Sequence, residues 1–159
     1  LLGMRQHDAR YAAIPLPAAP HIDATFSYIA TRSPISNPVT RRAQAEKKGN
    51  KEMMKKSDTY FSVPDSIHDG NPQEILDRRE KVTLLPMLIM QGGHDDNVIP
   101  PIQEKFAATY RAAGGECQLE IFEGCEHEWT AVPGPDADRS HDMVKAFIAK
   151  QLRALQKAA

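Results

Sequence analysis

The sequence predicts an α/β fold built on a parallel sheet, and three consecutive segments support this prediction. An apolar run at 84–90 leads into a loop with acidic residues, as a buried strand of a parallel sheet does. Residues 102–113 carry apolar side chains at helical spacing. A second apolar segment, 117–122, runs into a loop that contains His127. Strand, helix and strand in this order form the repeating unit of parallel α/β sheets.

Length, composition and charge agree with a single globular domain. The chain has 159 residues, 41% of them hydrophobic and 26% charged, which is ordinary for a soluble globular protein. A formal net charge of -1 argues against general binding of polyanions. Two cysteines, Cys117 and Cys125, are too few for a disulfide framework or a zinc site. No apolar run is long enough to cross a membrane, so we expect no membrane span.

The N-terminal part of the chain has weaker patterns. Residues 1–5 predict the tail of a helix, and 11–18 predict a buried strand whose end is weakened by prolines. Residues 20–38 have no clear period, so we expect an irregular segment with helical turns near 23–30.

A basic segment occupies 41–56, where seven Lys or Arg against two Glu give a charge of +5. A solvated helix, broken at Gly49 and Asn50, is favoured over a nucleic-acid interface, because no RNA- or DNA-binding motif accompanies these charges. We therefore expect no nucleic-acid partner.

Two further helices are predicted after the basic segment. Asn71 can cap the first of them, Pro72 suits its first position, and Glu74 completes a capping box. The second occupies 138–156, where apolar residues recur at three- and four-residue spacing.

Two loops of the central segment carry a resemblance to a known family. Residues 92–100, GGHDDNVIP, resemble the acid loop of α/β-hydrolases, in which the triad aspartate follows a glycine by three positions and precedes Val and Pro. Residues 122–129, FEGCEHEW, resemble the histidine loop of that fold. The order of acid before histidine fits the chain order Ser, Asp, His of these enzymes. The chain therefore resembles the C-terminal part of an esterase or lipase, or of a dienelactone hydrolase.

The resemblance implies a domain organisation. Residues 1–159 would be the C-terminal part of one α/β-hydrolase domain, with strands six to eight of its parallel sheet at 11–18, 84–91 and 117–122. Flanking helices would cover the sheet, and 20–82 would form a cap or lid insertion. The sixth strand would lack its usual neighbour, so we expect a missing N-terminal segment or another chain to pair with it.

The resemblance also implies the catalytic residues. Asp95 and His127 would both lie at the carboxyl edge of the sheet, where parallel α/β sheets place their sites. A histidine acts as general base when a buried acceptor fixes its tautomer, so the two residues need one another. Asp95 is preferred over Asp96 because it has the family's spacing from Gly92.

Neighbouring residues have less certain roles. His94 is a rival base that we expect to line the substrate pocket or to face solvent, and Trp129 would pack the histidine loop or form a wall of that pocket. His94, Asp95 and Asp96 are consecutive and therefore do not point at one metal ion, so we expect no metal. No cofactor is expected either.

The nucleophile is absent from the 159 residues, since no Gly-x-Ser-x-Gly occurs in them. The resemblance implies a serine upstream of Leu1 and an oxyanion hole in the same missing part. We expect a carboxylic ester hydrolase acting on small-molecule esters, and we expect this chain alone to be inactive. Two alternatives stay open, an amidase or peptidase of the same fold and a non-catalytic, hydrolase-like binding module. No signal peptide is visible, which favours a cytoplasmic location but leaves secretion open.

Overall fold

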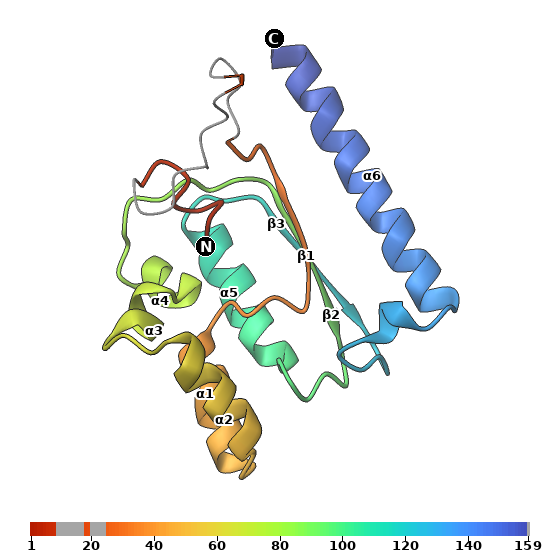
Figure 1. Ribbon diagram of the computed structural model, residues 1–159. Helices are drawn as coiled ribbons and strands as arrows, with labels where there is room; N and C mark the ends of the chain where they lie inside the picture. Colours follow the sequence, from red (N-terminus) through yellow and green to blue (C-terminus); the bar gives the residue numbers. More distant parts are fainter. Residues whose placement is uncertain (9–17, 20–24, 159) are drawn as a thin grey trace.

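The structure is a computed structural model that describes residues 1–8, 18–19 and 25–158 (Figure 1). Its described strands form one parallel sheet in the order β1-β2-β3, with the bounds Ile29–Arg32, Met87–Gly92 and Cys117–Phe122. The helices in these residues are α1 (Pro38–Lys47), α2 (Lys51–Tyr60), α3 (Ser66–Asp69), α4 (Pro72–Asp77), α5 (Pro100–Ala112), η1 (Trp129–Ala131) and α6 (Pro135–Ala158). The α/β class and the parallel pairing predicted from the sequence are confirmed.

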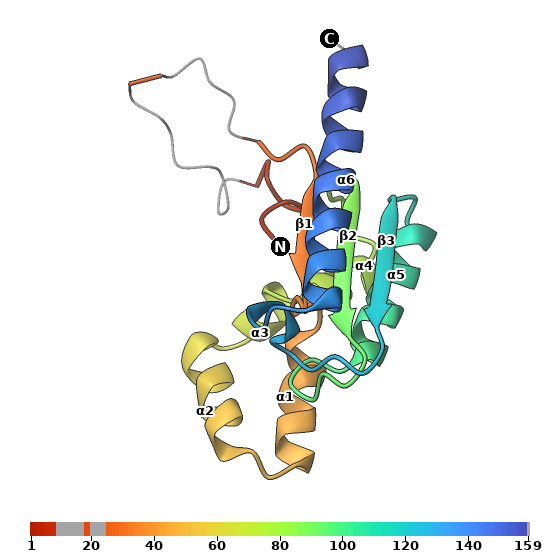
Figure 2. The same cartoon turned by 90° about the vertical axis from the view of Figure 1, so that its right-hand side faces the viewer.

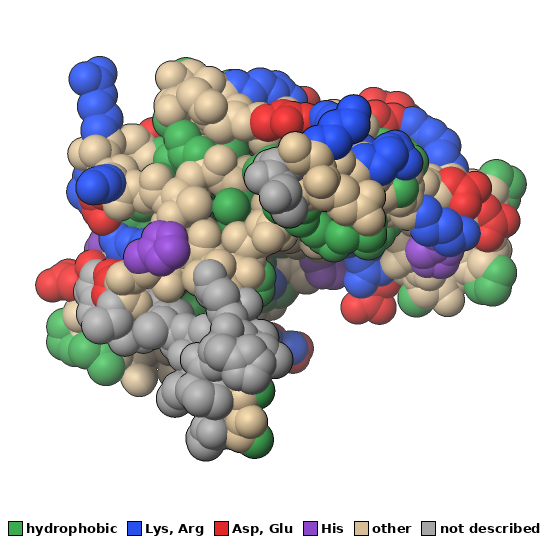
Figure 3. All heavy atoms as spheres, turned by 90° about the horizontal axis from the view of Figure 1, so that it is seen from above, with side chains coloured by type: hydrophobic (Ala, Val, Ile, Leu, Met, Phe, Trp, Pro, Cys, Tyr) green, Lys and Arg blue, Asp and Glu red, His purple; other side chains and the backbone are tan. Residues whose placement is uncertain are grey.

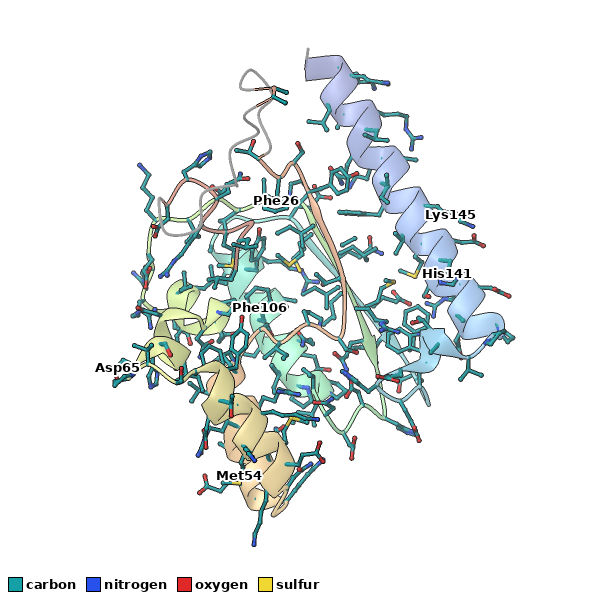
Figure 4. The ribbon with its side chains drawn as sticks, viewed as in Figure 1. Phe26, Met54, Asp65, Phe106, His141 and Lys145 are labelled. Atoms are coloured by element: carbon teal, nitrogen blue, oxygen red, sulfur yellow. The ribbon has the colours of Figure 1, made fainter. Side chains whose placement is uncertain are left out.

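The sheet is the middle of three layers, because α5 covers one of its faces and α6 the other (Figures 1 and 2). All six residues of β2 are buried, as expected for a parallel strand with both faces covered. Their side chains alternate between two cores. Ile89 packs in the core that includes Phe106 of α5, which Figure 4 labels, whereas Leu88 packs in the core that includes Phe147 of α6.

Asparagine caps set the starts of three helices. The side-chain oxygens of Asn37, Asn50 and Asn71 each accept a hydrogen bond from the backbone N–H three residues later. Such caps satisfy donors that lack a partner within the helix. The predicted break at Gly49 and Asn50 is confirmed, since it separates α1 from α2, and these two helices form a hairpin beyond the carboxyl ends of the strands (Figure 1).

The neighbour of β2 differs from the sequence prediction. We expected 11–18 to be that strand and the residues around 29–32 to be irregular, but β1 pairs with β2 over its whole length. Both sides of β2 are thereby taken, by β1 and β3, so the prediction that 11–18 is its neighbour is wrong. Most of 11–18 lies outside the described residues.

The chemistry of β1 explains why a strand forms there. Ile29 and Thr31 are β-branched and half-buried, whereas Ala30 and Arg32 are exposed, which is the alternation of an edge strand. The predicted insertion at 20–82 thus overlaps a strand of the sheet. The insertion outside the sheet is therefore the segment between β1 and β2, which contains α1 to α4.

Residues 1–5 form hydrogen-bonded turns instead of the predicted helix tail, with the N–H groups of Met4 and Arg5 both bonded to the Leu1 carbonyl. On the face seen in Figure 3, basic and acidic side chains are interspersed. Within 1–8, 18–19 and 25–158, no helix has the length and apolar character that crossing a membrane requires.

Candidate active site

A close approach of two loops brings the predicted residues together at the carboxyl edge of the sheet. The loop after β2 and the loop after β3 are joined by a backbone hydrogen bond of 2.9 Å from His94 N to Cys125 O. Gly92 permits this contact, because a Cβ at its position would lie 2.4 Å from the carbonyl oxygen of Glu126. Any other residue would push the two loops apart.

Asp95, in the loop after β2, has hydrogen-bond partners on both of its carboxylate oxygens. Its side chain is fully buried. One carboxylate oxygen, Oδ1, accepts from the backbone N–H groups of Asn97 at 3.0 Å and Val98 at 2.8 Å. The other, Oδ2, accepts from Gln91 Nε2 at 3.0 Å and lies 2.8 Å from His127 Nδ1. Four donors on one carboxylate fix its orientation and stabilise its ionised form.

The environment favours the ionised form of Asp95. Burial by itself raises the pKa of this carboxyl group, but hydrogen bonds from Val98, His127 and Gln91 outweigh burial and place the pKa below its ordinary value. The buried hydroxyl of Ser33 also lowers the pKa of Asp95, although its Oγ makes no hydrogen bond of ordinary geometry.

The contact with Asp95 fixes the tautomer of His127. An ionised carboxylate only accepts hydrogen bonds, so the ring proton lies on Nδ1 and the neutral ring presents Nε2 as a free acceptor. The side chain of His127 is 33% exposed, so part of it is accessible to a second reactant. The predicted hydrogen bond between Asp95 and His127 is confirmed, while their catalytic roles stay a prediction.

The two residues predicted to bind substrate make no side-chain hydrogen bond to this pair among the described residues. His94 is exposed, and its backbone N–H donates to Cys125 O at 2.9 Å. Trp129 is buried against Phe122, with ring centroids 5.2 Å apart, and the guanidinium of Arg32 lies over its ring at 5.7 Å. Trp129 therefore packs beneath the histidine loop, which is one of the two roles expected for it. A contact of either residue with substrate stays a prediction.

Sequence reasoning missed residues that support the acid loop. Gln91 Nε2 donates to Asp95 and also to Val98 O at 2.9 Å, which closes the loop on itself. The sequence signal that could have predicted the role of Gln91 is its position as a polar residue at the end of an apolar strand. The guanidinium of Arg41, in α1, donates to Asn97 Oδ1 at 2.6 Å. No local sequence pattern predicts this contact.

The chemistry available to this arrangement is proton transfer. In the part of the chain that the structure describes, no group of three or more His, Cys, Asp or Glu residues is placed to hold a metal ion. A buried carboxylate paired with a partly exposed imidazole is the orienting half of a general-base system.

Comparison with known proteins classifies the chain. Residues 2–154 match the model of the family described as prolyl oligopeptidase family. The chain belongs to the prolyl oligopeptidase family. None of the curated proteins is significantly similar to this family member in sequence.

Solved structures share the fold of this family member. Esterase B from Lactobacillus rhamnosis, inhibited by a tributyrin phosphonate, superposes with a TM-score of 0.62 at 14% identity over 86% of this chain and 44% of that one. Thermogutta terrifontis esterase 2, phosphoramylated by tabun, superposes with a TM-score of 0.60 at 18% identity. The match covers 94% of this chain and 49% of that one. Pyrococcus horikoshii acylaminoacyl peptidase superposes with a TM-score of 0.53 at 15% identity. The match covers 71% of this chain and 18% of that one.

These likenesses establish the fold, which is that of the α/β-hydrolases, as the resemblance in the two loops implied. The chain spans less than half the length of each of these three proteins.

Proposed function

We propose that the protein is a serine hydrolase in which His127 is the general base and Asp95 orients it. The observation that carries this proposal is the 2.8 Å contact between His127 Nδ1 and Asp95 Oδ2, made by two loops that follow neighbouring parallel strands. Membership of the prolyl oligopeptidase family supports it. The nucleophilic serine is proposed to lie in a part of the protein outside this sequence, because the 159 residues contain no Gly-x-Ser-x-Gly.

The proposed mechanism has two steps, and in each of them His127 takes a proton from the nucleophile and returns it to the leaving group. His127 Nε2 takes the proton of the serine hydroxyl as its oxygen attacks the ester carbonyl, and the imidazolium then donates that proton to the leaving alcohol. In the second step His127 takes a proton from a water whose oxygen attacks the acyl-enzyme, and it returns that proton to the serine oxygen as the carboxylic acid is released. Asp95 stays ionised throughout and stabilises the imidazolium, a role that suits its low pKa.

Carboxylic esters of small molecules are the proposed substrates, since two of the three similar structures above are named esterases. A peptidase or amidase is the second candidate, favoured by the family itself and by the acylaminoacyl peptidase among the similar structures. The helices α1 and α2 are proposed as the lid of the site, because they stand beyond the carboxyl edge of the sheet (Figure 2).

Covalent labelling of the full-length protein tests the proposal. A fluorophosphonate should add to one serine, giving a single mass increase in intact-mass spectrometry. His127→Ala should slow this labelling by at least about 10²-fold, because the serine loses its base. Labelling that is equally fast in the variant would contradict the assignment of His127. A protein that is never labelled and hydrolyses no ester would instead be the non-catalytic binding module.

A further inference from the structure

A cavity lies between the α1–α2 hairpin and the loop that carries Asp95. Its volume is about 420 Å³, within the range of small-molecule sites, and Asn97 forms part of its wall. The backbone N–H of Asn97 donates to Asp95 Oδ1 at 3.0 Å. The cavity is therefore attached to the same loop that holds the proposed triad acid.

Arg41 brings to this cavity a positive charge that has no direct ion-pair partner among the described residues. Its Nε and Nη2 share one acceptor, Asn97 Oδ1, at 3.0 and 2.6 Å. No carboxylate of the described residues lies within ion-pair distance of this half-buried guanidinium. Burial lowers the pKa of Arg41 from its ordinary value, and the negative charge of Asp95 partly offsets this effect. Nη1 makes no hydrogen bond within the described ranges, so donors remain for a ligand.

The rest of the lining matches an anion with an apolar body. Lys56 supplies a second cation, and Glu52, its partner at 2.7 Å, is an exposed residue that does not line the cavity. Tyr60 and Phe61, with ring centroids 4.8 Å apart, supply aromatic surface. No acidic side chain lines the cavity.

We propose that this cavity binds a carboxylate group of the substrate, held by Arg41 with Lys56 as a second contact. The proposal rests on the hydrolase function above and narrows it to esters whose acyl part ends in a carboxylate. A carboxylate matches the planar guanidinium in a charge-assisted hydrogen bond, whereas a neutral amide of the same shape gains only an ordinary one.

Two esters that differ only at the far end test this proposal in the full-length protein. The first is the mono-p-nitrophenyl ester of glutaric acid, and the second is its terminal carboxamide. We expect kcat/KM to be at least about tenfold higher for the carboxylate, the factor that a charge-assisted over a neutral hydrogen bond supplies. Arg41→Gln should bring this ratio close to one, since Gln keeps a donor for Asn97 but loses the charge. Lys56→Gln, at an exposed position, should lower the ratio partially.

Matched controls lie beside both residues in the chain. Arg42 pairs with Asp58 and does not line the cavity, so Arg42→Gln should leave the ratio unchanged. Lys55→Gln is the same control for Lys56. Equal kcat/KM for the two esters in the parent protein would overturn the proposal. If Arg41→Gln lowered kcat/KM by the same factor for both esters, the proposal would also be overturned. Arg41 would then only stabilise the position of the loop through Asn97.

A binding measurement separates this proposal from the hydrolase function. Titration calorimetry with glutarate and with glutaramide needs no turnover. Glutarate should bind the full-length protein more tightly than glutaramide by a similar factor, and Arg41→Gln should remove that difference even if no ester is hydrolysed. Equal binding of the two probes would reject the carboxylate site while leaving the function of Asp95 and His127 to its own test.

Discussion

Gln91 and His127 both contact the same oxygen of Asp95, at 3.0 and 2.8 Å. Gln91 is fully buried at the end of β2, so it holds the carboxylate from the protein side while His127 faces outward. The carboxylate is therefore held by a donor from the sheet as well as by the histidine loop.

Replacing Gln91 should weaken activity without touching a reacting group. In Gln91→Leu, Asp95 and Val98 O lose their shared donor, and we expect stability to fall by about 1–3 kcal/mol. The kcat should fall with little change in KM, since the residue positions Asp95 and meets no substrate. Gln103→Leu is the control, because Gln103 is also buried and bonded to Ser36, yet does not contact Asp95. An equal loss of kcat in both variants, measured by steady-state kinetics, would argue against a specific role of Gln91.

A methyl group at position 92 should separate the two loops of the site. The added carbon of Gly92→Ala would meet the carbonyl oxygens of Glu126 and Cys125 at 2.4 and 2.6 Å. We expect destabilisation of about 1–3 kcal/mol and a loss of activity, because backbone carbonyls cannot move aside as flexible side chains can. Gly134→Ala is the control, since a Cβ there meets no atom within 4 Å. Chemical denaturation with parallel activity assays checks this, and a Gly92→Ala protein as stable and active as Gly134→Ala would refute it.

The low pKa of Asp95 predicts a specific dependence of stability on pH. A carboxyl group whose pKa is lower in the folded state stabilises the protein above its unfolded pKa, about 3.9, and this stabilisation is lost as pH falls through the folded value. Asp95→Asn should therefore lower the free energy of unfolding most at neutral pH, and by progressively less below about pH 4. Urea denaturation across this range measures the effect. Asp96→Asn is the exposed control and should show little difference at any pH; an Asp95→Asn penalty independent of pH would count against the assignment.

The sequence predicted those parts of the fold whose signals are local. The buried strand at 84–91, the helix after it and the strand at 117–122 each carry a continuous apolar pattern, and the structure contains all three with ends shifted by at most a few residues. The contact of Asp95 with His127 was predictable because parallel strand ends share an edge and the two loop motifs are specific.

Other parts depended on contacts that no short stretch encodes. β1 has only four residues and is followed by Pro34, so its strand character comes from pairing with β2. The cavity residue Arg41 meets Asn97 across 56 positions of sequence, and its charge alone suggested a solvated helix. Its burial and its partner are visible only in three dimensions.

The central claim is that His127, and not the rival histidine His94, is the general base. Steady-state hydrolysis of p-nitrophenyl butyrate by the full-length protein with His127→Ala or His94→Ala tests this most directly. The claim predicts that His127→Ala lowers kcat/KM by at least about 10³-fold, because the serine loses both its base and the acid for the leaving group. His94→Ala should stay within a few-fold of the parent protein, since its side chain is exposed and does not meet Asp95. Comparable losses in the two variants, or an active His127→Ala enzyme, would contradict the account.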